Sequence, residues 1–181
     1  MRAGHSILDA GCGHGRNLVY FLRNGFPVFG LDPDPGAIRS VQALALRLAP
    51  GLPSMNFRAE AAESTSFPEH TADVVLSNAV LHFARDEQHF RAMLLGSWRL
   101  LKPGGLFFSR LASSIGMEER RFTPLGAGRF LLPDGSERFL VNEPILAELA
   151  GSLGARLLDP VKTTVVQDQR CMTTWVLRKP D

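Results

Sequence analysis

The residues with the clearest chemical potential are a carboxylate and three glycines that follow a short apolar run. Segment 7–17 reads ILDAGCGHGRN, with Asp9 two residues before the first glycine and with Gly11, Gly13 and Gly15 at alternate positions. Glycines at this spacing keep side chains off the backbone and permit positive φ angles, so backbone N–H groups can face a ligand. The pattern predicts a strand, a tight turn and a helix N-terminus. We interpret it as a nucleoside-binding turn; the alternative is a strand-to-helix turn that binds nothing.

A second carboxylate follows the next apolar run, about 20 residues beyond the glycine turn. Asp32 comes directly after the expected strand 27–31 and is followed by Pro33, Asp34 and Pro35. A carboxylate has two acceptor oxygens, so Asp32 is suited to bind both hydroxyls of a ribose. Asp34 is the better helix cap, because Pro35 would then occupy the first helical position. The alternative is that Asp32 is also only a cap.

Two later segments of the chain help to identify the kind of nucleoside-binding fold. The β-branched segment ADVVLSN at 72–78 predicts a buried strand, and LLKPGG at 100–105 predicts a helix end and a turn before another strand. The glycines read G-x-G-x-G, whereas a dinucleotide fingerprint reads G-x-G-x-x-G. From residue 6 to about 111 the chain resembles the class I S-adenosylmethionine-dependent methyltransferases.

This resemblance implies an α/β fold, a Rossmann-like doubly wound sheet of seven strands with the last strand antiparallel. It implies an enzyme that transfers a methyl group from S-adenosyl-L-methionine to a small molecule, leaving S-adenosyl-L-homocysteine. Asp9 would face the cationic amino-acid end of the cofactor, and the acidic or small residues after the third strand would bind adenine. The expected cofactor-binding residues are Asp9, Gly11, Cys12, Gly13, Gly15, Asn17, Asp32, Pro33, Glu60, Ala61 and Asn78.

The chain departs from the family pattern in two places. The first strand begins near residue 7, whereas the family usually has one or two helices before it, so the N-terminus looks minimal or truncated. Ala61 stands where the family most often has an acid, and Glu60 lies one residue early. Which segment would close over the cofactor therefore stays open.

Hydrophobic periodicity and turn residues predict one domain over residues 1–181, with an insertion at about 112–141 after the fifth strand. Within the insertion, apolar runs around Pro133-Asp134-Gly135-Ser136 predict a β-hairpin that projects over the cofactor pocket. The other expected helices cover 17–24, 35–48, 87–101 and 143–153, and the other expected strands cover 7–9, 55–59, 106–110, 156–166 and 171–178.

Three side chains are candidates for the reaction itself. His82 follows the fourth strand and is a candidate general base, although a packing or helix-start role is the alternative. Arg110 and Arg170 are expected at the carboxyl edge of the sheet, where guanidinium groups would bind an anionic acceptor in a two-pronged way. Other arginines of the insertion are expected to be solvated charges balanced by neighbouring acids; these are Arg120, Arg121 and Arg138, with Glu118, Glu119 and Glu137.

Composition limits the alternatives. A net charge of +2 with scattered basic residues disfavours nucleic acid as a partner. Cys12 and Cys171 form neither a disulfide framework nor a metal cluster, so no metal is expected. The sequence shows no signal peptide and no membrane-spanning run, which indicates a cytoplasmic protein; oligomerisation is left open. The other candidate functions are a cofactor-binding domain without catalysis and a nucleotide-dependent oxidoreductase.

Overall fold

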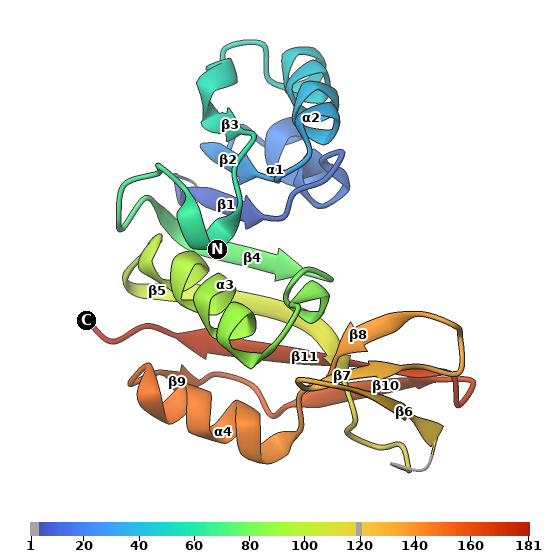
Figure 1. Cartoon of the computed structure of the whole chain (residues 1–181). Helices are drawn as coiled ribbons and strands as arrows, with labels where there is room; N and C mark the ends of the chain where they lie inside the picture. The colour runs from blue at the N-terminus through green and yellow to red at the C-terminus, as the bar shows by residue number, and fades with distance from the viewer. Residues whose placement is uncertain (1–3, 119–120) are drawn as a thin grey trace.

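The computed structural model describes residues 4–118 and 121–181, which form a main sheet flanked by helices and a second, smaller sheet (Figure 1). Seven strands of the main sheet follow the order β10-β11-β5-β4-β1-β2-β3, and an eighth, β9, pairs with β11. The strands of this sheet are β1 (Ile7–Ala10), β2 (Val28–Leu31), β3 (Phe57–Arg58), β4 (Ala72–Asn78), β5 (Leu101–Ser113), β9 (Arg156–Leu157), β10 (Lys162–Val166) and β11 (Arg170–Arg178).

The helices are α1 (Val19–Arg23), α2 (Pro35–Leu48), α3 (Glu87–Arg99) and α4 (Glu143–Ser152). Short 3-10 turns join several of these elements at η1 (Arg16–Leu18), η2 (Ser54–Asn56), η3 (Ala62–Ser64) and η4 (Leu81–Phe83). The expected helix 17–24 is therefore divided between η1 and α1. Among the described residues, no helix has both the length and the hydrophobicity needed to cross a membrane.

The strands at the centre of the sheet run in the predicted directions, whereas one edge of the sheet differs from the prediction. β1 runs parallel to β2 and β4, β4 runs parallel to β5, and β11 is antiparallel to β5. The predicted antiparallel last strand is thus confirmed. The single strand expected at 156–166 is wrong, because the chain leaves the sheet around Pro160, whose nitrogen cannot donate to a ladder, and forms β9 and β10 instead.

The two faces of the sheet are covered by different helices. Side chains alternate along β1, so Ile7 packs with the residues of α1 and α2 while Leu8 packs with those of α3 and α4. Val74 and Val75 of β4 divide in the same way. Trp98, expected in the core, is buried on the α3 side. Since both faces are covered, the central strands are almost wholly apolar except at their carboxyl ends.

Side-chain caps fix where the longer helices begin. Asp34 accepts hydrogen bonds from the N–H groups of Gly36 and Ala37 at 2.8 and 3.2 Å, as the sequence predicted. Asp86 accepts one from His89 at 2.7 Å. Such caps satisfy backbone donors that have no partner inside the helix.

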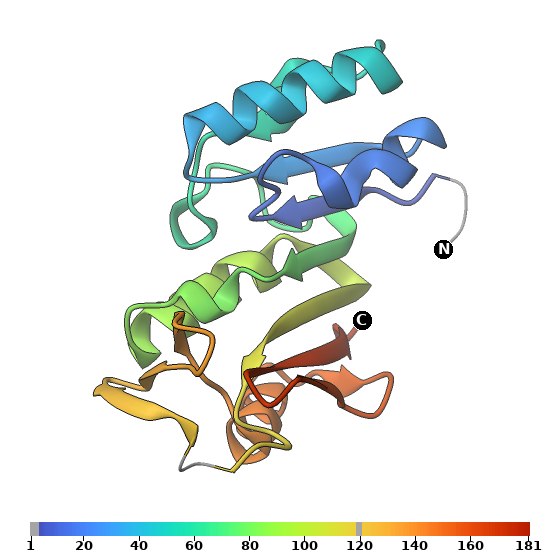
Figure 2. The ribbon, with the colours of Figure 1, turned by 90° about the vertical axis from the view of Figure 1, so that its right-hand side faces the viewer.

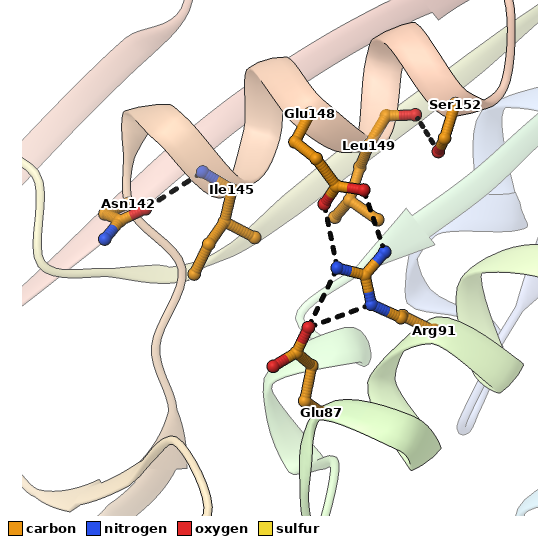
Figure 3. Close-up of polar contacts among 7 residues, drawn as sticks. All are labelled: Glu87, Arg91, Asn142, Ile145, Glu148, Leu149 and Ser152. Atoms are coloured by element: carbon orange, nitrogen blue, oxygen red, sulfur yellow. Dashed lines mark hydrogen bonds and ion pairs between the residues drawn. The ribbon is translucent and has the colours of Figure 1, made fainter.

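An ion-pair network joins α3 to α4 on the outer surface (Figure 3). The guanidinium group of Arg91 binds Glu87 of its own helix and spans to both carboxylate oxygens of Glu148, at 3.2 and 2.8 Å. Asn142 caps α4 by accepting the N–H of Ile145 at 3.0 Å. The network sets the spacing between helices that otherwise meet only through the core, although exposed pairs of this kind contribute at most about 1 kcal/mol.

The insertion forms its own antiparallel sheet from β6 (Thr123–Gly126), β7 (Arg129–Leu131) and β8 (Glu137–Phe139). The predicted hairpin corresponds to β7 and β8, and β6 is an additional strand that the sequence did not indicate. The sheet lies beyond the carboxyl ends of β4 and β5, away from α2 (Figures 1 and 2). A separate apolar cluster anchors it, made of Ala112, Phe122, Leu132, Leu140 and Met172.

The close packing of α3 against η3 can be tested by substituting a glycine at the contact. A Cβ atom at Gly96 would lie 2.2 Å from the carbonyl oxygen of Ala62, which is backbone and cannot rotate away. Helix propensity alone would make Gly96→Ala stabilising by about 1 kcal/mol. We expect the overlap to prevail and the substitution to lower the free energy of unfolding by about 1 to 3 kcal/mol in urea titrations.

Gly151 in α4 is the matched control, since a Cβ there would meet no atom within 4 Å. Gly151→Ala should therefore raise the free energy of unfolding by about 0.5 to 1 kcal/mol. If both substitutions stabilise the chain equally, α3 and η3 are not packed as described.

Candidate functional site

The glycine turn after β1 has the conformation that its sequence predicts. Gly11, Gly13 and Gly15 have φ angles of 88°, 50° and 82°. A Cβ atom on Gly11 would lie 2.3 Å from the side chain of Val80, so the turn is packed tightly beneath. A Cβ atom on Gly13 would meet nothing within 4 Å. The turn is therefore closed on one side and open at Gly13, where a ligand can approach the backbone.

Asp32, at the end of β2, holds this turn in place. One carboxylate oxygen accepts the N–H of Gly13 at 2.9 Å, and the other accepts the N–H of Asp34 at 3.0 Å. Each oxygen keeps a further acceptor position, because a carboxylate offers about four in all. Asp32 thus serves as a loop anchor while it retains the capacity for the expected ribose contact.

A buried polar chain runs beneath the turn. Asn17 donates from its amide to Asp9 at 3.2 Å, and Asn78 donates to the amide oxygen of Asn17 at 3.1 Å. Asp9 is fully buried, and among the described residues Asp9 Oδ1 and Asn78 Oδ1 have no hydrogen-bond partner. Buried acceptors without donors are rare in folded proteins, so each requires an explanation.

Burial also changes the charge of Asp9. The pKa of its carboxyl group is raised to about 7, because removal from water and the nearby charge of Asp32 outweigh the opposing hydrogen bond from Asn17. At neutral pH, Asp9 is therefore divided between its protonated and ionised forms. A cationic group beside it would favour the ionised form.

Through Gly11 the turn borders a cavity of about 520 Å³, here named the glycine-loop cavity; Gly13 is not among its lining residues. Of the expected cofactor-binding residues, Gly11, Asp32, Pro33 and Ala61 line it. Its remaining lining residues are Leu31, Ala62, Glu63, Ala79, Val80, Phe83, Arg85, His89 and Met93.

The other seven expected cofactor-binding residues do not line this cavity. Four of them belong to the turn and to the polar chain beneath it, namely Asp9, Gly13, Asn17 and Asn78, and the remaining three lie elsewhere. Cys12 is buried beneath the turn, beside Gly30, and Gly15 packs against Val41 of α2. Glu60 does not line the cavity, because its carboxylate accepts hydrogen bonds from Thr65 and Ser66 within the following loop. The adenine contact that the family resemblance implied for Glu60 is corrected accordingly.

A second cavity of about 250 Å³, here named the arginine cavity, adjoins the first. Ala79 and Phe83 line both, so the two spaces meet at the segment after β4. The other lining residues of the arginine cavity are His82, Arg110, Ala112, Leu132, Asp134, Ser136, Arg138, Arg170 and Met172. Both arginines singled out in the sequence therefore face the same space.

The three arginines of this cavity are held differently. Within the described part of the chain, the guanidinium group of Arg110 has neither a hydrogen-bond nor an ion-pair partner. Arg138 lies over the ring of Phe83, 4.7 Å from its centroid, and Arg170 pairs with Asp134 at 3.2 Å. The expectation that Arg138 is a solvated surface charge balanced by Glu137 is wrong, because Glu137 pairs with Arg129 and leaves Arg138 facing the cavity.

The other charges of the insertion fit the surface role. Arg121 pairs with Asp168 at 3.5 Å, and both side chains are exposed. Glu118 also has an interaction partner. Glu119 and Arg120, which the sequence interpretation included among these balanced charges, lie outside the described residues.

His82 is placed as a hydrogen-bond donor rather than as a base. Its Nδ1 accepts the N–H of Ala112 at 3.1 Å, so the proton of the neutral ring is on Nε2. Burial, together with the nearby charges of Arg138 and Arg110, lowers its pKa to about 4. The proposed general base is therefore corrected: the nitrogen that is free of the backbone carries a proton and can only donate.

Sequence reasoning assigned no site role to three residues that line one or both cavities. Ala79 adopts a φ of 62°, uncommon for a residue other than glycine, and its N–H binds the carbonyl of Arg110 at 2.7 Å. Phe83 is 58% exposed and lines both cavities. Asp134 belongs to a P-D-G-S turn, where an aspartate is expected for turn geometry alone.

Comparison with known proteins agrees with this geometry. A family profile described as a methyltransferase domain matches residues 8–109. A ubiquinone biosynthesis O-methyltransferase from Methylobacterium nodulans is 33% identical over 168 residues, which cover 89% of this chain and 62% of that protein. A trans-aconitate 2-methyltransferase from Methylobacterium radiotolerans is 31% identical over 163 residues, which cover 88% of this chain and 55% of that protein.

Among solved structures, a methyltransferase from Methanosarcina mazei superposes with a TM-score of 0.79 at 22% identity. The superposition covers 99% of this chain and 94% of the other, and at this identity it shows a shared fold. The chain spans about half to three fifths of the length of the curated relatives that it matches.

The open space above Gly13 gives a prediction about ligand binding. Gly13→Ala should weaken the binding of S-adenosylhomocysteine at least tenfold in calorimetric titration, because the methyl group would fill the space that a ligand needs. Alanine at this φ also costs about 1 to 2 kcal/mol in the free energy of unfolding.

Gly25→Ala provides the control, since Gly25 has a φ of 71° and equally open surroundings but ends α1 far from the cavity. It should lose similar stability and keep its affinity. Equal affinities for the Gly13 and Gly25 variants would place the ligand elsewhere.

The raised pKa of Asp9 predicts how stability changes with pH. A carboxyl group with a folded pKa near 7 and an ordinary value of 3.8 binds more protons in the folded state between these limits, so stability falls as pH rises through them. Asp9→Asn removes this loss. At pH 8 the free energy of unfolding of the variant should exceed that of the original chain by about 2 to 4 kcal/mol. This difference should shrink towards pH 4.

Asp73 offers a control of opposite sign. Burial alone would raise its pKa, but hydrogen bonds from Ser6 and Lys102 outweigh burial and lower the pKa to about 2. Asp73→Asn should therefore lose stability at pH 8, and the loss should fade as pH falls towards 2. A pH profile unchanged by Asp9→Asn would mean that Asp9 is ionised in the folded chain.

Proposed function

The chain belongs to the class I S-adenosylmethionine-dependent methyltransferases, and from this premise we propose that it methylates a small anionic acceptor bound in the arginine cavity. The observation that carries the proposal is the junction between the two cavities. They share Ala79 and Phe83, so a donor in one and an acceptor in the other would meet at the end of β4. Ligands of open α/β sheets bind at this edge.

The residues around the glycine-loop cavity fit S-adenosylmethionine. The turn is open at Gly13, Asp32 has acceptor positions left for ribose hydroxyls, and Pro33 and Ala61 offer apolar surface for a base. Asp9 is the nearest buried carboxyl group to the turn and lacks a partner at Oδ1, which suits the neighbourhood of a cationic amino-acid end. When bound, the cofactor supplies a methyl group on a positively charged sulfur, which needs no further activation.

The protein's part in such a reaction is positioning. Holding two reactants in a productive geometry lowers the barrier by about 7 to 11 kcal/mol. Phe83 lies between the two cavities and carries Arg138 on its ring, so this side chain separates and orders both ligands. Neither a metal nor a covalent nucleophile is required by the transfer.

The arginines support an anionic acceptor. Arg110 and Arg170 come from different strands and line one cavity, and Arg138 adds a third positive charge. Arginine binds carboxylate and phosphate through two parallel hydrogen bonds, which also fix the orientation of the bound group. An acceptor held in this way would be oriented towards the shared boundary of the cavities.

Labelled methyl transfer tests the proposal. With methyl-labelled S-adenosylmethionine and pools of small acids, phosphate esters and neutral compounds, label should enter the acidic pools. Arg110→Met should lower kcat/KM at least tenfold, because a charge-assisted contact contributes about 1.5 to 3 kcal/mol. Incorporation into neutral compounds alone would contradict the anionic acceptor.

Calorimetric titration distinguishes the remaining candidates. Binding of S-adenosylhomocysteine without any incorporation of label would favour a cofactor-binding domain without catalysis. Binding of NAD or NADP in its place would favour an oxidoreductase and overturn the proposal.

A further inference from the structure

We propose that the arginine cavity binds a small dicarboxylic acid and that an oxygen of one of its carboxylates receives the methyl group. This inference rests on the proposed function and adds the substrate class and the methylated atom. Three observations support it: the net charge of the cavity, the contacts that hold its guanidinium groups in place, and the lack of a suitable general base in its described lining.

The charge of the cavity matches a doubly negative ligand. Three guanidinium groups and one carboxylate line it, which gives a net charge of +2 while His82 is neutral. Within the described residues, Arg110 has no anionic partner, and Arg138 meets an aromatic ring and a backbone carbonyl oxygen rather than a carboxylate. Two positive charges are therefore left for a ligand to neutralise.

Two of the three guanidinium groups are also held in place before any ligand binds. Arg138 lies against Phe83 and donates to the carbonyl oxygen of Glu137 at 2.7 Å. Arg170 is fixed by Asp134, whose own position is set by hydrogen bonds from Ser136. Less conformational freedom is then lost on binding, and a flat two-pronged contact with a carboxylate is favoured.

His82 adds a neutral donor to the same space. With Nδ1 occupied by the N–H of Ala112, its Nε2–H is free to donate. His82 is 4% exposed and lines the cavity, so this N–H can donate to a ligand oxygen there. Two kinds of donor, guanidinium and imidazole, are thus available to the oxygens of one acid.

The described lining has no group suited to remove a proton from the acceptor. His82 holds its proton on the free nitrogen. Asp134 is a weak base, because hydrogen bonds from Ser136 and Arg170 outweigh burial and lower the pKa of its carboxyl group. A hydroxyl or phenol acceptor would have to lose a proton during the reaction, and general bases serve this need. A carboxylate is already ionised at neutral pH and needs none.

The transfer then balances without proton movement. A lone pair on the carboxylate oxygen forms a bond to the methyl carbon, the carbon–sulfur bond breaks, and its electron pair goes to sulfur. One negative and one positive charge disappear together, and the products are a methyl ester and a thioether. The second carboxylate stays bound to the arginines and provides the orientation.

Binding without the cofactor is the first test. Calorimetric titration uses succinate, fumarate, glutarate and adipate as probes, with butyrate, butane-1,4-diol and phenyl phosphate as controls. At least one dicarboxylate should bind at least tenfold more tightly than butyrate, and Arg110→Met should weaken that binding at least tenfold. Arg47→Met is the matched control, because Arg47 is exposed on α2 and lines neither cavity, and it should leave the affinity unchanged.

A thermal unfolding measurement on each variant ensures that lost binding does not reflect lost folding, and Arg138→Met gives a second variant if Arg110→Met is unfolded. The proposal is overturned if no dicarboxylate binds more tightly than butyrate. It is also overturned if phenyl phosphate binds more tightly than every dicarboxylate, which would indicate a phosphate ester as the acceptor.

The chemistry of the product is the second test. A methyl ester releases labelled methanol in mild alkali, whereas a methyl ether or an N-methyl group keeps its label. Release of volatile label supports the carboxylate oxygen as acceptor. A base-stable product would refute it while leaving the methyltransferase proposal intact, and binding of S-adenosylhomocysteine without any labelled product would instead count against the proposed function itself.

Discussion

β1 pairs in parallel on both sides, and the position of every functional group depends on this pairing. Asp9 lies opposite Gly30 of β2 and opposite Leu76 of β4, so three strands end at the same edge within one or two residues of each other. The turns after β1 and β2 are then close enough for Asp32 to accept the N–H of Gly13. That hydrogen bond fixes the open turn, and the turn shapes the larger cavity.

The same edge concentrates buried polar groups that a core would normally exclude. Asp9, Asn17 and Asn78 form one chain beneath the turn, and two of their oxygens have no donor in the described structure. Leaving a buried acceptor unmatched costs about 1 to 3 kcal/mol. The apolar clusters on both faces of the sheet offset this cost, which is how a fold retains groups whose partners belong to a ligand.

The acceptor side is built from segments that are far apart in the chain. β11 is antiparallel to β5, so its first residues reach the edge where the parallel strands end, and Cys171 lies opposite Ser113. Arg170 therefore comes to the same space as Arg110, 60 residues earlier in the chain. The small sheet β6–β8 adds Arg138 and Asp134 from outside the main fold. An insertion anchored by its own apolar cluster can change without disturbing the cofactor side.

The sequence by itself determined the parts that depend on local chemistry. Glycine spacing fixed the turn, Asp34 and Asp86 fixed two helix starts, and alternating apolar residues fixed the central strands and their two buried faces. These features need only neighbouring residues, because a cap or a positive φ is satisfied within a few positions. The glycine turn and Asp32 could therefore be assigned in advance.

Only the tertiary structure decided which partners distant side chains have. The carboxylate of Glu60 accepts hydrogen bonds from Thr65 and Ser66 and so does not reach the cavity. The ring of His82 accepts the N–H of Ala112 at Nδ1, which leaves its other nitrogen as a donor. Arg138 faces the cavity because Glu137 pairs with Arg129. Each outcome depends on which hydrogen bond or ion pair forms when segments meet. Spacing along the chain cannot predict which of these contacts forms. Several side chains of the same type could bind the same partner, and only the folded sheet brings one of them within hydrogen-bonding distance.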